Sequence, residues 1–281
     1  MILVADSGST KTNWIATDKN RNFEFHTAGI NPQIQTNNQI IEIFNEQIKH
    51  QNWFEEISHV YFYGAGCSTD EKCENVKECL LPHFPNSEIY VEHDLTAAGR
   101  ALFGQGKGIA CIIGTGSNSG TYNGRDIVDN IPALGYTLGD EGSGAHIGKM
   151  FIRDYLYEIT PENFRKEFES ETDLNKQLIF DNVYKNPSPN VFLASLATFV
   201  TDHNSDKYFF NLIYNSFVDF VKYHILLYAG YEEMEIGVIG SIAYYNQEIF
   251  RKVLNESNLQ LKKIIQSPIK ELTDYHVQLM F

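Results

Sequence analysis

Small residues and a carboxylate follow the first apolar run of the chain. The run ends at Ala5 and leads into the letters DSGSTK, so Asp6 precedes a turn of small hydroxylated residues from Ser7 to Thr10. Backbone N–H groups in such a turn can converge on an anion. Asp6 itself cannot bind phosphate, but its carboxylate could hold a magnesium ion, usually through water. The alternative is an ordinary hairpin turn with a capping aspartate, and the turn alone does not decide between them.

A second turn of the same form follows another apolar run. The letters IIGTGSN place Gly114, Thr115, Gly116 and Ser117 directly after a strand-like segment. The next glycine is Gly120, one residue too late for a dinucleotide-binding G-x-G-x-x-G motif, and no Gly-Lys-Ser/Thr ending of a P-loop occurs. A plain hairpin could look like this, but the recurrence of the pattern favours a second phosphate-binding turn.

Asp94 occupies the junction between a predicted strand and a predicted helix in the letters VEHDLTAAGR. A carboxylate at the carboxyl end of a strand can serve as the general base for a hydroxyl nucleophile. It can equally be the N-cap of the following helix. The two interpretations are compatible.

Two further glycine-rich segments are candidates for ligand contact. The letters LGYTLGDEGSG surround the acids Asp140 and Glu141 with glycines, which suggests backbone held against a ligand, although a solvated loop is the alternative. Gly240 and Ser241 follow an apolar strand-like run. That turn could flank a purine, or it could be a simple strand-to-helix junction.

Composition limits the class of protein. The 281 residues carry a formal net charge of −14, which argues against nucleic acid or an anionic membrane surface as the main partner. No apolar run is long enough for a membrane span, and no signal peptide is visible. The cysteines fit a reduced protein better than a disulfide scaffold. We therefore expect a cytoplasmic protein.

The elements that must position these residues form a repeated pattern. Ile2–Ala5 and Asn13–Thr17 predict a hairpin about the first turn, and Ile109–Ile113 with Ser119–Tyr122 predict the same about the second. Such a layout indicates a weak internal duplication in an α/β protein. We predict one domain over residues 1–104 and a second over 105–266. The second carries a helical insertion, including a long helix over Lys207–Tyr228, and a closing helix over 267–281 packs back on the first domain.

The order of these parts resembles the actin, hexokinase and Hsp70 ATPase superfamily. Within it, the sequence is similar to the BadF/BadG/BcrA/BcrD ATPase group and most closely to N-acetylglucosamine kinases. This resemblance covers essentially the whole chain, and its most specific part joins Gly114–Asn118 to the segment Gly139–Ser143. It implies two ribonuclease-H-like domains, each a mixed β-sheet with flanking helices, around a central cleft that closes over ATP, Mg²⁺ and a sugar.

The resemblance also implies roles for individual residues. Asp94 would take the proton from the sugar 6-hydroxyl, and Asp6 would orient magnesium through water. The residues implied to bind the ATP phosphates are Ser7, Gly8, Ser9, Thr10, Lys11, Gly114, Thr115 and Gly116. Those implied near the adenosine are Gly240 and Ser241. Those implied to bind the sugar are Asn31, Asp94, Ser117, Asn118, Gly135 and Asp140. The expected partner is a small amino sugar, and we expect a homodimer.

Two departures from the family pattern concern the first turn and sugar recognition. Ser7 stands where glycine is usual, and Leu134-Gly135-Tyr136 replaces a bulky aromatic pattern. Glucosamine and N-acetylmuramic acid therefore remain alternatives to N-acetylglucosamine as the substrate.

Two other activities stay open within the superfamily. An ATP-driven activator of 2-hydroxyacyl-CoA dehydratases would need cysteines spaced for an iron–sulfur cluster, whereas Cys67, Cys73 and Cys79 recur every six residues. A non-catalytic sugar sensor would not need Asp94 and both phosphate turns. The spacing of the histidines and cysteines does not indicate a zinc site.

Overall fold

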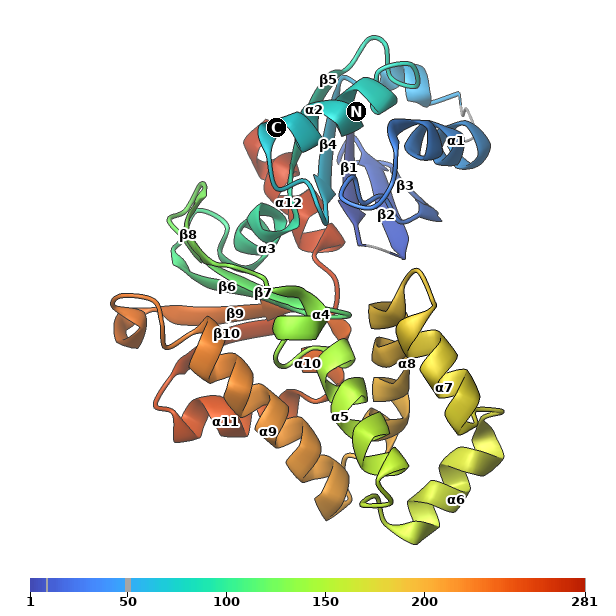
Figure 1. Ribbon diagram of the computed structural model, residues 1–281. Helices are drawn as coiled ribbons and strands as arrows, with labels where there is room; N and C mark the ends of the chain where they lie inside the picture. Colours follow the sequence, from blue (N-terminus) through green and yellow to red (C-terminus); the bar gives the residue numbers. More distant parts are fainter. Residues whose placement is uncertain (9, 49–51, 281) are drawn as a thin grey trace. The chain divides into compact units, whose positions relative to one another are not determined.

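A computed structural model describes residues 1–8, 10–48 and 52–280 of the chain. The chain divides into two compact units, which are described separately (Figure 1). The first unit comprises residues 1–106, 124–126 and the segment from 267 onward, and the second comprises residues 107–123 and 127–266. No described helix is long and apolar enough to cross a membrane.

The first unit is built on a five-stranded mixed sheet. Its strands are β1 (Ile2–Ser7), β2 (Lys11–Thr17), β3 (Asn22–Ala28), β4 (His59–Gly64) and β5 (Glu88–His93). They lie in the order β3-β2-β1-β4-β5, with β1 antiparallel to β2 and parallel to β4. The hairpin expected about the first turn is confirmed.

Helices cover both faces of this sheet. Its helices are α1 (Asn37–Gln47), α2 (Asp70–Leu80), α3 (Asp94–Phe103) and α12 (Ile269–Met280). Leu3 and Ala5 belong to the same buried cluster as Phe44 of α1 and Val76 of α2. Because side chains alternate along a strand, the intervening residues of β1 face the opposite side, where α3 and α12 pack together (Figure 1). Both faces of β1 are therefore buried, which explains its continuous apolar run.

A buried polar cluster fastens α12 to the first unit. The Arg100 guanidinium donates to the Tyr63 hydroxyl over 2.6 Å and to Glu92 Oε1 over 2.7 Å. The Tyr63 oxygen lies 2.8 Å from His276 Nε2 on α12. Burial, with a smaller contribution from Arg100, lowers the pKa of His276 to about 3. The imidazole is therefore neutral near pH 7, and its hydrogen bond with the Tyr63 hydroxyl joins α12 to β4.

The second unit repeats the arrangement of the first sheet. Its strands are β6 (Gly108–Ile113), β7 (Ser117–Tyr122), β8 (Ile127–Ile131), β9 (Glu235–Ile239) and β10 (Gln260–Ile265). The strand order is β10-β9-β6-β7-β8. Read from β8 to β10, it matches the order β3-β2-β1-β4-β5 of the first sheet, and β6, like β1, is antiparallel to one neighbour (β7) and parallel to the other (β9). The internal duplication expected from the sequence is thus present in the topology.

A large set of helices packs on the second sheet and on one another. They are α4 (Gly135–Leu138), α5 (Gly144–Leu156), α6 (Glu162–Glu171), α7 (Lys176–Tyr184), α8 (Pro189–Asp202), α9 (Lys207–His224), α10 (Ser241–Tyr245) and α11 (Gln247–Glu256). Helix α5 packs extensively on α8, and α9 packs on α5 and α11. The helix predicted over Lys207–Tyr228 is four residues too long, because α9 ends at His224.

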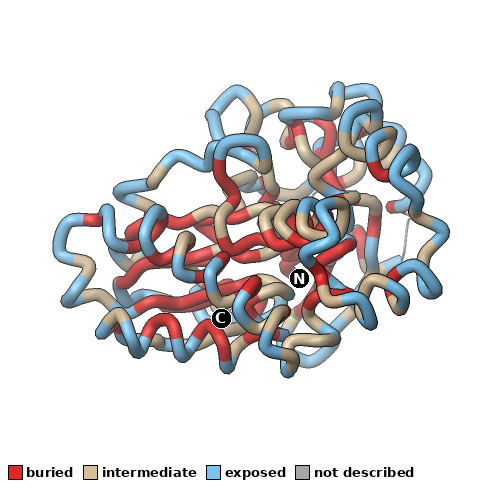
Figure 2. Tube along the Cα trace, turned by 60° about the horizontal axis from the view of Figure 1, so that its bottom comes forward, coloured by how far each residue is buried: buried red, intermediate tan, exposed pale blue. Residues whose placement is uncertain are grey.

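Three strands that the sequence pattern did not predict lie at edges of the sheets. They are β3, β8 and β10, and each has several exposed or half-buried positions. Figure 2 shows long buried stretches of the trace, with exposed and half-buried segments around them. An edge strand that buries little apolar surface leaves a weak sequence signal, and this explains why these strands were missed.

Candidate active site

Two acidic residues meet at one edge of the first sheet. Asp6 lies near the carboxyl end of β1, and Asp94 directly follows β5, the outermost strand of the parallel set. Burial and the nearby Asp94 carboxylate raise the pKa of Asp6 to about 7. The Ser267 side chain lowers this pKa by a smaller amount. Near neutral pH, Asp6 can therefore exchange its proton for a cation.

His93, and not Asp94, caps helix α3. Its Nδ1 accepts the Leu95 N–H over 2.9 Å, so Asp94 is the first helical residue and its carboxylate is free of the capping role. The same Nδ1 lies 2.7 Å from Asp94 Oδ1. Since Nδ1 carries either a lone pair or a proton, it can accept the Leu95 N–H or donate to Asp94, but not both at once. Burial lowers the pKa of His93, but the Asp94 carboxylate outweighs it, and the net shift is upward.

The first turn is held by the hydroxyl of Ser7. Ser7 is buried, with its Oγ 2.7 Å from Thr12 Oγ1 and accepting the Ile30 N–H over 2.9 Å. Its side chain therefore braces the turn against the next segment, and only its backbone remains for a phosphate. Gly8 donates its N–H to the Lys11 carbonyl over 3.0 Å. Thr10 and Lys11 are exposed, and Ser9 lies outside the described residues.

Asn31 follows Ile30 and is fixed by a glycine that the sequence pattern did not single out. Its Oδ1 accepts the Gln33 N–H over 3.0 Å, and its own N–H donates to Gln35 Oε1 over 2.7 Å. A Cβ atom on Gly66 would stand 2.1 Å from Asn31 Oδ1, and Gly66 has a φ of +83°. Glycine is thus required there for Asn31 to occupy its place.

The second turn is fastened to the start of helix α5. The Gly114 N–H donates to the Gly116 carbonyl over 3.0 Å. The Gly144 and Ala145 N–H groups donate to the carbonyls of Gly114 and Thr115 over 2.8 and 3.0 Å. Two donors of the α5 N-terminus therefore hold the turn itself and are not free for an anion.

Gly240 supports the same turn from the end of β9. A Cβ atom there would stand 2.2 Å from the Ile113 carbonyl oxygen, and its φ is +123°. Only glycine fits this close approach of two backbones. The structure thus places Gly240 against the second turn, and Ser241 next to it is exposed at the start of α10.

Asp140 is packed against the second turn. It is buried, with a left-handed φ of +59°, and its Oδ1 accepts the Ser117 N–H over 3.3 Å. A Cβ atom on Gly116 would stand 3.1 Å from both Asp140 oxygens. Burial raises the pKa of Asp140. The solvated-loop alternative is therefore wrong at this position.

Helix α9 contacts the loop that carries Asp140 and holds it in place. Three of its residues, spaced one turn apart, contact the loop or α5. Ser216 Oγ accepts the Gly142 N–H over 3.2 Å, Phe220 leaves no room for a side chain at Gly142, and His224 Nε2 lies 3.1 Å from Glu141 Oε2. The sequence does not predict these contacts, because α9 is remote from the loop in the chain and its apolar pattern indicates only burial.

The remaining residues of the implied sugar set also lie in the second unit. Ser117 is buried at the start of β7. Asn118 Oδ1 accepts from Asn130 Nδ2 over 3.0 Å, which leaves its amide group for a ligand. Gly135 begins α4 with a φ of +73° and nothing within 4 Å of an added Cβ.

The chain is similar over almost its whole length to proteins of known structure. No protein-family model and no curated protein matches the chain. Among solved structures, a Porphyromonas gingivalis protein provisionally named N-acetylglucosamine kinase is 39% identical, with 99% of each chain covered and a TM-score of 0.95. The chain belongs to this N-acetylglucosamine kinase-like family.

More distant structures agree on the fold alone. A Chromobacterium violaceum protein with the same provisional name has a TM-score of 0.74 at 13% identity, over 98% of this chain and 99% of that one. A Schistosoma mansoni hexokinase crystallised with glucose has a TM-score of 0.51 at 11% identity, over 99% of this chain and 85% of that one. The chain thus shares its fold with these two proteins.

Among the residues that the structure describes, six buried side-chain polar atoms lack a hydrogen-bond partner, and two of them belong to the implied sugar set. These two are Asp94 Oδ1 in the first unit and Ser117 Oγ in the second. An unsatisfied buried polar atom costs about 1–3 kcal/mol, so such atoms call for an explanation. Both atoms belong to the set of residues that the family resemblance implies for the sugar.

The first unit also fits a magnesium ion. Asp6 brings a desolvated carboxyl close to a second acid, and a cation would relieve the repulsion between them. Among the described residues, no cluster of three or more histidines, cysteines or acids is arranged around a metal position. Magnesium at Asp6 would accordingly take most of its ligands from water and phosphate, as that ion usually does.

Proposed function

We propose that this protein is an ATP-dependent kinase that phosphorylates the 6-hydroxyl of N-acetylglucosamine. The observation that carries the proposal is the buried Oδ1 of Asp94 at the start of α3, which has no hydrogen-bond donor while His93 Nδ1 accepts the Leu95 N–H. A carboxylate oxygen in that state is suited to accept a proton from a bound hydroxyl. The neighbouring Asp6, with its raised pKa, supplies the position for a cation.

The residues of the first unit would prepare the nucleophile. Asp94 would accept the 6-hydroxyl proton as the oxygen attacks the γ-phosphorus and ADP leaves with the electrons of the broken bond. His93 would keep its Nδ1 for the Leu95 N–H, which leaves the Asp94 carboxylate to the sugar. Magnesium, held by Asp6 through water, would neutralise charge on the transferred phosphoryl group. Asn31, fixed by Gly66, would donate its amide to a sugar hydroxyl.

The residues of the second unit would hold the phosphates and the sugar. The N–H groups of Thr115 and Gly116 would donate to ATP oxygens, while the Gly114 N–H keeps its bond to the Gly116 carbonyl and holds the turn in place. Ser117 Oγ and the Asp140 carboxyl would bind sugar hydroxyls. Gly240 and Ser241 would lie near the adenosine.

The amino group of the sugar distinguishes the substrate alternatives. Glucosamine carries a cation, N-acetylglucosamine a neutral amide, and N-acetylmuramic acid an additional carboxylate. A site that hydrogen-bonds the acetamido group rejects a sugar without it, because its own polar groups would be left unpaired. A substrate panel therefore decides between these sugars directly.

The experiment measures ADP release with Mg²⁺ and ATP over that panel, in the wild type and in Asp94→Asn. We expect N-acetylglucosamine-dependent turnover, with kcat lowered about 10²–10⁴-fold in the variant. Asp70→Asn is the matched control, because Asp70 is also the first residue of a helix in the first unit but is exposed. Its kcat should stay within about twofold of wild type.

Other results would redirect the assignment. Turnover with glucosamine or N-acetylmuramic acid alone would keep the chemistry and change the substrate. Full activity in Asp94→Asn would refute Asp94 as the base. ATP hydrolysis without any sugar dependence would favour the dehydratase-activator alternative, which an anaerobic iron and sulfide assay would then test.

We further propose that the kinase is a homodimer. Sedimentation velocity at micromolar concentration tests this, and a single monomeric species would contradict it.

A further inference from the structure

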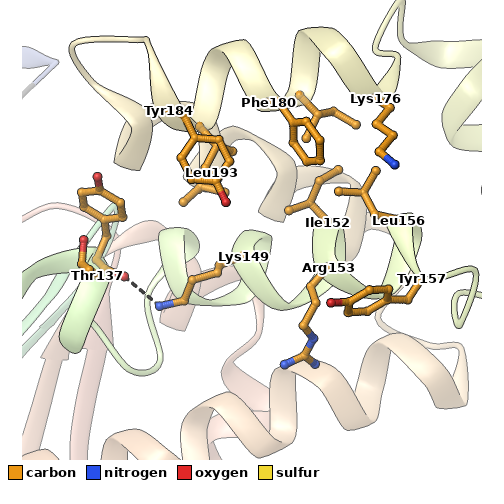
Figure 3. A pocket seen from close by; sticks show the side chains of 13 residues that line it. Thr137, Lys149, Ile152, Arg153, Leu156, Tyr157, Lys176, Phe180, Tyr184 and Leu193 are labelled. Atoms are coloured by element: carbon orange, nitrogen blue, oxygen red, sulfur yellow. Dashed lines mark hydrogen bonds between the residues drawn. The ribbon is translucent and has the colours of Figure 1, made fainter.

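A pocket separate from the implied sugar and ATP residues lies wholly within the second unit. Its volume is about 710 Å³, and α4, α5, α7 and α8 supply its walls (Figure 3). Ile152, Ile179 and Leu193 are buried in its floor, while Tyr136, Phe180 and Tyr184 contribute aromatic rings. Pockets of this size are typical of small-molecule sites.

The charge of the pocket is opposite to that of the protein. Its charged lining residues are Lys149, Arg153 and Lys176, and no acid is among the lining residues. The whole chain carries a net charge of −14. A lining with only positive charge is therefore a local reversal, which favours an anionic ligand.

Two of the three cations lack a carboxylate partner. Among the residues that the structure describes, neither Lys149 nor Lys176 has a carboxylate oxygen within 4.0 Å. Arg153 differs, because it donates to Asp154 over 2.9 and 3.0 Å. The two lysines are thus the positively charged groups of the pocket that are available to an anionic ligand.

Each lysine is held at the pocket by its surroundings. Lys149 is half-buried, and its Nζ donates to the Tyr136 carbonyl over 2.7 Å, which leaves further N–H donors for a ligand (Figure 3). Lys176 lies at the start of α7, with its Nζ 5.7 Å from the centre of the Phe180 ring. Figure 3 shows the two ammonium groups well apart, with apolar side chains between them.

We propose that this pocket binds an amphiphilic anion, with an apolar body and a carboxylate or phosphate head. The apolar body would lie against the side chains of α5 and α7, and burial of that surface would contribute most of the affinity. The head would bind Lys149, whose partly desolvated position strengthens a charge-assisted hydrogen bond. Lys176 would attract the anion from the outer side of the pocket.

An anion bound in this pocket would affect sugar binding. This step alone rests on the proposed function. Lys149 holds the carbonyl of Tyr136 in α4, the helix that begins at Gly135. A head group that competes for the Lys149 ammonium would loosen α4. We expect the KM for the sugar to change severalfold with kcat little altered, because the α3 base is in the other unit.

Calorimetric titration with decanoate, decyl phosphate and neutral decanol tests the site without any kinase assay. We expect saturable binding of one or both anions at one site per chain, with decanol at least about tenfold weaker. The two anions distinguish a fatty-acid head from a phosphate head. Lys149→Met keeps the length of the side chain and should weaken anion binding about tenfold or more, and Lys176→Met should weaken it less.

Lys166→Met is the matched control. Lys166 is an exposed lysine of α6 that pairs with Glu162 and does not line the pocket, so its loss should leave binding unchanged. A thermal unfolding curve for each variant verifies folding. Absence of saturable binding, or equal binding in wild type and both pocket variants, would overturn the proposal. A dimer that Tyr184→Glu dissociates would also overturn it and assign the pocket to a subunit interface.

Discussion

The two strand–turn–strand segments of this protein share a topology but are held by different means. In the first, the hydroxyl of Ser7 connects the turn to Thr12 and Ile30. In the second, helix α5 donates backbone N–H groups to the turn, and Gly240 packs its bare backbone against it. Side chains thus brace the first turn, and backbone contacts brace the second.

The difference extends to the acid that accompanies each turn. Asp6 is near another acid, and its pKa is raised to about 7, so it can change charge at neutral pH. Asp140 is instead fixed between the Ser117 N–H and the bare face of Gly116. The first turn is therefore suited to a ligand that brings a cation, and the second to recognition by shape.

The largest expected effect comes from adding a side chain at Gly240, where two backbones approach closely. In Gly240→Ala, the new methyl group overlaps the Ile113 carbonyl at 2.2 Å, and a φ of +123° is unfavourable for alanine. We expect Tm to fall by roughly 6 to 12 °C and kcat/KM for ATP to fall at least about tenfold. In the first turn, Gly8→Ala would place its methyl 3.8 Å from the nearest oxygen and should change both far less. Equal effects in the two variants would refute the contrast.

The next effect concerns the charge of Asp6. Magnesium must displace the Asp6 proton, so its affinity should fall about tenfold for each pH unit below about 7. Titration of Mg²⁺ into the protein with a non-hydrolysable ATP analogue at pH 6, 7 and 8 measures this. Asp6→Asn should bind magnesium weakly, with a flat pH profile. A wild-type profile that is equally flat would contradict the shift.

The same proton affects the stability of the ligand-free protein. The unfolded Asp6 has a pKa near 3.8 and the folded one about 7, so the folded state holds the extra proton between these values. Stability attributable to Asp6 therefore falls as pH rises from about 4 to 7. Relative to wild type, Asp6→Asn should become more stable as pH increases through this window, as denaturant unfolding would record.

Much of the candidate site could be predicted from the sequence, because its signals are local. The two turns each combine small residues with a preceding apolar strand, and Asp94 stands at a strand-to-helix junction. The repeated layout also predicted the repeated topology, since each hairpin is contiguous in sequence. The family resemblance then connected the parts.

The supports of the candidate site could not be predicted, because they depend on contacts between segments remote in the chain. Nothing near Ser7 indicates that its hydroxyl reaches Ile30, so a phosphate role for its side chain was a reasonable expectation from its position alone. His224 supports the Asp140 loop from a helix whose apolar pattern shows only its burial. Gly66 looks like an ordinary strand end until Asn31 is placed against it.

A smaller effect is expected from Gly116→Ala. Its methyl group would meet both Asp140 oxygens at 3.1 Å, so the carboxyl must shift by a few tenths of an ångström. We expect the KM for the sugar to rise about three- to tenfold with a nearly unchanged Tm, as steady-state kinetics would show. Gly114→Ala meets nothing within 4 Å and is the control for added bulk in the same turn. An unchanged sugar KM in Gly116→Ala would argue against Asp140 as a sugar ligand.

The smallest effect on activity is expected where the first turn is braced. Ser7→Ala removes the acceptor of the Ile30 N–H and the partner of Thr12 Oγ1, and it should cost about 1–3 kcal/mol of unfolding free energy. Because the Ser7 hydroxyl is already bonded to Thr12 and Ile30, kcat should stay within about twofold once the protein is folded. Thr10→Ala, at an exposed position of the same turn, should cost less than about 0.5 kcal/mol. A large loss of kcat in Ser7→Ala at full stability would instead mean that this hydroxyl contacts ATP, and the two turns would then bind phosphate in the same way.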